Sequence, residues 1–272
     1  MFRLTIFNVG HGFCAYATTP GDVDILFDCG YDDELQFYPS TYFSDRNISR
    51  IHNLTISHFD QDHICDLENL REFIHFEGLS RNKSIPAGFL RKQKNDEGGI
   101  TAAMDSAIEM HSSWTTPVLA TPDYGGVRVR RFYNDYPTFT DMNNLSLVTF
   151  LEYEGCGIVV PGDLDQPGWI ALLKNPAFCE CLSKTNYFIA SHHGRAEGYC
   201  EEVFDYCSPR LVILSDKGIK YKSQEHDYTK YASGLPDNGG GTRRVLTTRS
   251  DGHICIEKPT GQPVTVHYNL SL

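Results

Sequence analysis

A six-residue segment beginning at His58 contains four side chains of the types that bind divalent cations. It reads HFDQDH, and it directly follows the run Leu54–Ser57, which is typical of a short buried strand. The carboxylates Asp60 and Asp62 stand so close together that they repel each other unless a cation lies between them. With His63 at its end, the segment predicts a metal site. The alternative interpretation is a polar loop that caps the following helix.

Three further segments also place such side chains where strands are expected to end. Asp163 follows the apolar run Ile158–Val160, and His192 and His193 stand before a glycine after another apolar run. Asp28 ends a fourth run, where it can orient a ligating histidine or merely start a turn. Taken alone, Asp163 is equally well explained as the N-cap of the next helix. Paired histidines before a glycine are seldom a packing solution, so they favour a metal or catalytic role.

Taken together, these segments resemble the metallo-β-lactamase superfamily, in particular the branch of ComEC-type DNA-uptake proteins and their free-standing relatives. The run Phe7–Gly12 resembles that branch's first strand and glycine turn. Ser57–His63 resembles its signature, in which an aspartate replaces the second histidine of the wider superfamily. The later matching blocks are Asn143–Val148, Pro161–Asp163 and His192–Gly194. The sequence departs from the branch at Cys65 and Asp66, where two glycines are usual, and it has no clear counterpart of the superfamily's third histidine at the first metal.

The pattern of apolar residues predicts how the chain is organised around these segments. β-rich runs in both halves alternate with helical ones, which favours an α/β fold with two packed sheets and helices outside. The resemblance implies the same arrangement, the αββα sandwich of the metallo-β-lactamase fold with two mixed β-sheets. We expect a single domain over residues 1–272, with a divergent insertion at about 80–141. Helices are expected over residues 67–79, 100–114, 165–182 and 224–232.

The resemblance also implies a ligand set for two divalent metal ions, with a hydroxide between them as nucleophile. An aspartate in place of an imidazole makes the site harder, which favours manganese or magnesium, while three imidazoles keep zinc possible. The implied first-metal ligands are His58 and Asp60, and those of the second metal are Asp62, His63 and His192, with Asp163 bridging. Asp28 would orient a ligand histidine by binding it on the side away from the metal, and Asp62 is also a candidate catalytic residue.

Other candidate residues concern proton transfer and substrate binding. His193 or His226 is a candidate general acid for the leaving oxygen, although His226 is equally well explained as a surface histidine of a helix. Lys217 and Lys222 are candidate phosphate contacts, with solvated lysines as the alternative. Asn144, in one of the matching blocks, is a further candidate for substrate binding.

The overall charge limits the partners of the chain. Its formal net charge is -11 and its pI is near 5.4, so it repels nucleic acid on average and any contact must be local. The stretch Arg81–Lys94, together with Arg128, Arg130 and Arg131, is a candidate for such a contact. A small phosphodiester such as a cyclic nucleotide meets this charge more easily than a long duplex.

The cysteines and the N-terminal segment bear on the compartment. The nine cysteines are scattered and odd in number, and Cys179 and Cys181 lack a second pair at zinc-finger spacing. We therefore expect free thiols in a reducing cytoplasm. The opening run Met1–Phe7 is too short for a signal peptide or a membrane span, so no membrane contact is expected.

These observations leave three hypotheses of function. The first is a phosphodiesterase or nuclease acting on nucleic acid or on a cyclic or other small nucleotide, as the resemblance implies. The second is a hydrolase of a thioester, lactone or other carbonyl substrate, because a fold alone does not select the reaction. The third is a non-catalytic subunit that binds partner proteins of a defence or competence system, in which the metal is structural.

Overall fold

Two β-sheets form the centre of the molecule in the computed structural model, which describes residues 1–116, 122–218, 223–236 and 241–271. Within this part the first sheet has the strand order β17 (Thr265–Leu270), β16 (His253–Lys258), β1 (Phe2–Ile6), β2 (Ala15–Thr18), β3 (Asp24–Phe27), β5 (Asn53–Thr55) and β7 (Leu79–Ser80). The second has the order β15 (Val245–Thr247), β12 (Leu211–Leu214), β11 (Tyr187–Ile189), β10 (Cys156–Val160), β9 (Val148–Tyr153) and β8 (Arg128–Phe132). Both sheets are mixed. Strands β3, β5 and β7 run parallel in the first sheet and β10, β11, β12 and β15 in the second, while the other neighbouring strands pair antiparallel.

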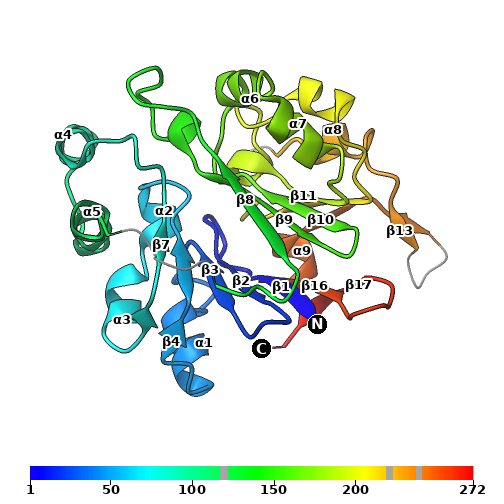
Figure 1. The fold of residues 1–272 in the computed structure, drawn as a ribbon, viewed down its shortest axis with the longest axis horizontal. Coiled ribbons are helices and arrows are strands. Elements are labelled where there is room, and N and C mark those ends of the chain that lie inside the picture. Colours follow the sequence, from blue (N-terminus) through cyan, green and yellow to red (C-terminus); the bar gives the residue numbers. More distant parts are fainter. Residues whose placement is uncertain (117–121, 219–222, 237–240, 272) are drawn as a thin grey trace.

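Helices cover the outer face of each sheet (Figure 1). The first sheet is covered by α1 (Pro39–Asp45), α2 (Gln61–Ile64), α3 (Leu67–Arg71), α4 (Ala87–Asp96) and α5 (Ala102–Ser113). The second is covered by α6 (Gln166–Leu172), α7 (Pro176–Leu182) and α8 (Glu225–Tyr228). Smaller elements are the pairs β4 (Arg50–Ile51) with β6 (His75–Phe76) and β13 (Leu235–Pro236) with β14 (Thr242–Arg243), and the short helix α9 (Thr248–Asp251). The layers confirm the αββα arrangement expected from the sequence.

The two-residue period of the strands explains why three separate cores form. Successive side chains of a strand point to opposite faces. In β3, Ile25 and Phe27 enter the core between the sheets, while Leu26 enters the core beneath the helices. A slip of one residue would exchange these faces, so burial on both sides fixes the register.

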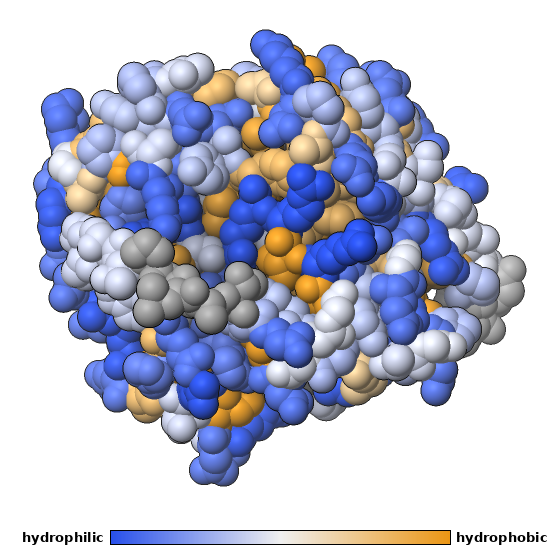
Figure 2. Space-filling model, viewed as in Figure 1, coloured by the Kyte–Doolittle hydropathy of each residue, from blue (hydrophilic) through white to orange (hydrophobic). Residues whose placement is uncertain are grey.

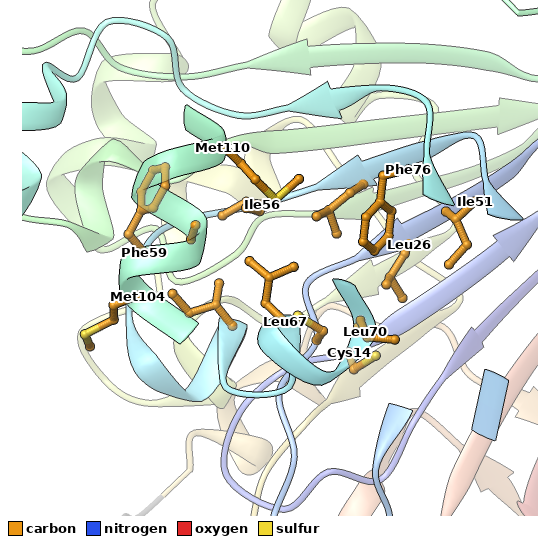
Figure 3. Packing of buried hydrophobic residues seen from close by; sticks show 14 of the residues in the cluster. Cys14, Leu26, Ile51, Ile56, Phe59, Leu67, Leu70, Phe76, Met104 and Met110 are labelled. Atoms are coloured by element: carbon orange, nitrogen blue, oxygen red, sulfur yellow. The ribbon is translucent and has the colours of Figure 1, made fainter. Parts of the chain in front are cut away.

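The helices over the first sheet hold the HFDQDH segment in place. Phe59, within that segment, is 1% exposed and packs in the same core as Met104 and Met110 of α5 and Leu67 of α3 (Figure 3). Its ring also contacts that of His111 at 5.3 Å in an edge-to-face arrangement. Because Phe59 points into this core, the polar side chains on either side of it are turned the other way.

The expected helix over residues 165–182 is wrong in its continuity, because the structure has two helices there. The first ends at Leu172, and the second begins at Pro176. Proline has no N–H to donate and its ring clashes with the preceding turn, so it starts a helix but does not continue one. The side chain of Asn175 caps the second helix by accepting a hydrogen bond from the N–H of Ala177 at 3.0 Å.

Two other expected helices are too long, and one is confirmed. Helix α3 ends at Arg71, and the chain then forms β6 and β7, because the apolar residues that follow pair in parallel with β4 and β5. The helix expected over 224–232 is limited to Glu225–Tyr228. The helix expected over 100–114 is confirmed as α5.

None of the helices in the described part of the chain is long and apolar enough to cross a bilayer.

The segment 80–141, expected as a divergent insertion, contributes to both halves of the fold. It supplies α4 and α5 to the layer over the first sheet and the edge strand β8 to the second sheet. It therefore connects the two halves of the sandwich along one side.

All nine cysteines are free thiols, and most are buried among apolar side chains.

Candidate metal centre

The predicted ligands meet at one end of the sandwich because each follows the carboxyl end of a strand. Asp28 follows β3 and His58 follows β5, which run parallel in the first sheet. Asp163 follows β10, and His192 and His193 follow β11, which run parallel in the second sheet. Carboxyl ends of parallel strands lie at the same edge of a sheet. The packing of the sheets brings the two edges together.

Four imidazoles converge on the carboxylate of Asp163. The Nε2 atoms of His63 and His193 lie 3.1 and 3.2 Å from its oxygens, and those of His58 and His192 lie 3.9 and 4.0 Å away. The carboxylate is buried, with 6% of its side chain exposed. Only the contacts with His63 and His193 are short enough for hydrogen bonds. A carboxylate shared by bound cations would have the other ligands arranged around it in this way.

On the side of the first sheet, an oxygen atom lies within hydrogen-bond distance of Nδ1 in each candidate ligand histidine. His63 donates from Nδ1 to Oδ2 of Asp28 at 2.8 Å. The hydroxyl of Ser57 donates to the same carboxylate at 2.6 Å and lies 3.0 Å from Nδ1 of His58, from which it can accept. When Nδ1 carries the proton, Nε2 presents its lone pair to a metal, and such partners orient metal-binding histidines.

The second sheet repeats this arrangement. His193 donates from Nδ1 to the backbone carbonyl of Ser215 at 2.9 Å, and His192 donates from Nδ1 to Oδ1 of Asp165 at 2.8 Å. Both histidines have positive φ, 49° and 55°, which turns their side chains in different directions from a single tight turn. All four rings therefore present Nε2 to the centre.

The donor atoms fit divalent cations. One ligand atom each from Asp62, His63, Asp163 and His193 lie within 4.8 Å of one another. Beside them, Nε2 of His58 is completely buried and has no hydrogen-bond partner in the described part of the chain. A buried nitrogen without a partner costs about 1–3 kcal/mol, which a bound cation would offset.

The two consecutive histidines are placed differently in the structure from what the sequence predicted. His192 was expected as the ligand and His193 as a general acid, but His193 is the one placed among the four clustered ligand atoms. His193 is also the more buried of the two, with 3% of its side chain exposed against 12% for His192. Nε2 of His192 lies at the edge of the cluster and also contacts the Arg195 guanidinium at 3.1 Å.

Opposite charges in the cluster shift the pKa values of its members. Burial alone would raise the pKa of the Asp60 carboxyl, but its contacts with His58 and Lys94 hold it at about 2. Burial alone would lower the pKa of His193, but the nearby carboxylates, chiefly Asp163, raise it to about 9. These shifts show how strongly the carboxylates favour positive charge at this position.

Lys94 is a residue of the site that the sequence analysis did not single out. Its ammonium group, 3% exposed, contacts Oδ1 of Asp60 and lies 2.7 Å from Oε2 of Glu97. It comes from α4, so the segment 80–141 reaches the HFDQDH loop directly. Its position in a basic stretch gave no indication of this contact, which depends on how α4 packs.

Replacing Lys94 with methionine is expected to lower the free energy of unfolding by about 2–4 kcal/mol, measured by urea denaturation. The variant keeps the apolar stem but leaves the Asp60 carboxylate without its buried cation. The matched control is Lys92→Met in the same helix. Lys92 is 79% exposed and pairs with the exposed Asp96, so its loss should cost less than about 0.5 kcal/mol. Equal effects of the two substitutions would contradict the role assigned to Lys94.

A pocket of about 230 Å³ opens beside the centre and shares His193 with it. Lys217, a predicted phosphate contact, lines this pocket and forms ion pairs with Asp32 at 2.7 Å and Glu34 at 2.8 Å. The lining also contains Arg195, whose position directly after the block His192–Gly194 could have indicated it. The lining contains the carboxylates Asp32 and Asp216 as well, so the pocket combines charges of both signs with direct access to the cluster.

His11 also lines this pocket, and the sequence analysis did not single it out. Its Nε2 lies 2.7 Å from the guanidinium of Arg195 and 3.3 Å from Oδ2 of Asp62. Burial and the neighbouring His193 lower the pKa of His11 to about 4. Its place in the early glycine turn, between two glycines, was the one available indication.

The structure does not bring the remaining predicted residues to the cluster. Oδ1 of Asn144 accepts a hydrogen bond from the N–H of Gly168 at 2.7 Å, so this side chain holds the start of α6. His226 is exposed on α8, because the helix turns Tyr228 inward instead. Lys222 lies outside the described residues.

Comparison with known proteins gives a distant relationship. No profile of a known protein family matches the sequence. The chain is similar to ComE operon protein 3 of Bacillus subtilis (strain 168), with 26% identity over 214 residues, which are 78% of this chain and 25% of that protein. The chain thus spans about a quarter of the length of this relative.

Solved structures with a similar chain path are more distant in sequence. CmlA, a diiron β-hydroxylase from Streptomyces venezuelae, is 14% identical, with a TM-score of 0.48 over 90% of this chain and 53% of that one. A variant metallo-β-lactamase from Cronobacter sakazakii is 15% identical, with a TM-score of 0.39 over 67% of this chain and 74% of that one. No function follows from structural likenesses this distant.

Proposed function

We propose that this chain is a metal-dependent hydrolase of the metallo-β-lactamase fold that cleaves phosphodiester bonds. The observation that carries the proposal is the convergence of four imidazole Nε2 atoms on Asp163, with every Nδ1 held by an oxygen atom. Structural polar clusters seldom orient four rings in this way, whereas a centre of two cations with a shared carboxylate requires it.

The proposed ligand set follows from the distances. One cation would lie among the four clustered ligands Asp62, His63, Asp163 and His193. A second would lie near His58, whose Nε2 is 3.5 Å from Oδ2 of Asp60. The carboxylate share of this set favours hard cations such as manganese or magnesium over zinc.

The chemistry of the centre favours phosphate substrates. Bound divalent cations would acidify a water molecule and stabilise the negative charge that develops on a phosphoryl group. The chain itself supplies orientation: Asp28 fixes the ring of His63, and Lys94 fixes the carboxylate of Asp60. In the adjoining pocket, the guanidinium of Arg195 lies beside His192 and would be a contact for a phosphodiester oxygen, whereas Lys217 is held by Asp32 and Glu34. The sequence motifs that resemble those of ComEC-type proteins favour the same substrate class, and the similarity to ComE operon protein 3 is consistent with that resemblance.

A panel assay tests the proposal. The protein is incubated with manganese, magnesium or zinc and with bis-p-nitrophenyl phosphate, single-stranded DNA, RNA, cyclic nucleotides, a lactone and a thioester. We expect metal-dependent turnover of at least one phosphodiester, and a loss of at least about a hundredfold in Asp62→Ala. Elemental analysis should give about two cations per chain. Turnover of only the lactone or thioester would favour the carbonyl hydrolase, and phosphodiester turnover that survives Asp62→Ala would refute the site.

A further inference from the structure

A second cavity, of about 660 Å³, lies between the edges of the two sheets. Residues of β5, β7 and β8 and the segments beside them line it, and the candidate metal ligands do not. The face of the molecule that carries the β8 edge is mostly hydrophilic, with apolar side chains exposed between charged ones (Figure 2). The lining combines cations with aromatic rings, namely Arg81, Lys83, Arg131, Tyr124 and Tyr133.

Arg131 is the most informative of these residues. It lies two residues after Val129 in β8, on the same face of the strand. Val129 packs against the core between the sheets, so the side chain of Arg131 also faces inward. Its Nη2 donates to Oδ1 of Asn53 at 3.1 Å, but its Nε is buried and has no hydrogen-bond partner within the described residues. Among those residues no carboxylate forms an ion pair with Arg131. Arg131 is half-buried, and the Tyr124 hydroxyl is a further polar neighbour of its guanidinium. A partly buried cation without a carboxylate partner is costly, and a bound anion would offset that cost.

Two further cations of the lining also lack a carboxylate partner. Arg81 is 6% exposed and donates from Nη2 to the backbone carbonyls of His111 at 2.9 Å and Trp114 at 2.8 Å. Lys83 is exposed, and no ion pair with it occurs in the part of the chain that the structure describes. Glu77, the carboxylate of the lining, is already paired with Arg50.

Uncompensated positive charge is unexpected in a protein of net charge -11. Three cations around one cavity repel each other, so their concentration there favours an anionic ligand. Phosphate oxygens match both the guanidinium and the ammonium group.

The aromatic side chains narrow the class of ligand. Tyr133 is 38% exposed, and Tyr124 lines the same cavity. Tyrosine rings beside basic side chains bind nucleotides by stacking on the base while the cations hold the phosphate. We propose that this cavity binds a nucleotide phosphate, either a free nucleotide or one unit of a single strand, at a site separate from the metal centre. The proposal goes beyond the hydrolytic function and does not depend on it.

Binding is tested by fluorescence anisotropy at low ionic strength. The probes are a fluorescein-labelled single-stranded thymidine oligonucleotide, a duplex of the same length, and thymidine 5′-monophosphate as competitor. The Asp62→Ala background prevents turnover, and gel electrophoresis checks that the oligonucleotide stays intact. Competition by the mononucleotide identifies a free nucleotide as the ligand, whereas binding of the strand without such competition identifies a strand unit. Either result supports the site when the substitutions below behave as expected.

Matched substitutions locate the site. Lys83→Ala is expected to weaken binding about three- to tenfold and to reduce its salt dependence. Tyr133→Ala is expected to weaken it about tenfold through lost stacking. The controls are Lys174→Ala and Tyr206→Ala, which remove an exposed lysine and a 44% exposed tyrosine elsewhere and should change the affinity less than about twofold.

Three results would overturn the proposal. They are no measurable binding of any probe, equal effects of the matched lysines, and a preference for the duplex. Each leaves the hydrolytic proposal intact, because that proposal is judged by turnover in the wild-type protein. Conversely, binding in the Asp62→Ala background without any wild-type turnover would support this site and contradict the proposed hydrolase.

Discussion

Replacing Asp163 with alanine is expected to remove bound cations and to lower turnover by at least about a thousandfold. This carboxylate is the point on which four imidazoles converge, and both proposed cation positions include it or lie next to it. Its loss would leave the rings facing one another without a shared anion. Elemental analysis and steady-state kinetics on the most active phosphodiester measure the two effects.

The control for this substitution is Asp135→Ala, which removes an exposed carboxylate. It should leave metal content and turnover within about twofold of wild type, which separates the specific effect from a change in net charge. Circular dichroism shows whether each variant folds. A folded Asp163→Ala protein with its full metal content would refute the centre as described here.

The second large effect concerns the histidine pair. His193→Ala is expected to remove at least one cation per chain and to lower turnover by at least about a hundredfold, because His193 belongs to the tight cluster with Asp62, His63 and Asp163. His192→Ala leaves that cluster complete. It should therefore keep at least one cation per chain, even where turnover falls.

A general-acid role for His193 predicts a different result. In that case His193→Ala would keep its metal content and lose only turnover, with the alkaline limb of the pH profile altered, because a general acid is active only while it is protonated. Comparing metal content and turnover in the two variants thus separates a ligand from an acid. Equal metal loss in both would show that His192 is also required to hold the cation of the tight cluster.

Local patterns were sufficient to predict the architecture and to indicate most of the residues that the structure gathers in the candidate metal centre. Apolar runs of strand length, each ended by a histidine or aspartate, recur in both halves, and the alternation of Ile25, Leu26 and Phe27 between two cores follows from the same period. The helix lengths were less predictable. Pro176 divides one helix, and β6 and β7 replace the end of another, because strand pairing competes with helical periodicity.

The contacts that complete the site could not be predicted, because they join distant parts of the chain. Lys94 reaches Asp60 only through the packing of α4, and Arg195 reaches His11 across 184 positions. Nothing in the sequence near Arg131 indicates that its guanidinium faces a cavity between two sheet edges.

The sequence by itself predicted HFDQDH, Asp163 and the histidine pair as the candidate site, since residue type and strand-end position are local properties. Only the tertiary structure decided which histidine of the pair joins the cluster. That choice depends on two consecutive positive φ angles and on the carbonyl of Ser215, which holds the ring of His193 in place. Backbone conformation and long-range hydrogen bonds set the direction of a side chain, and a linear pattern contains neither.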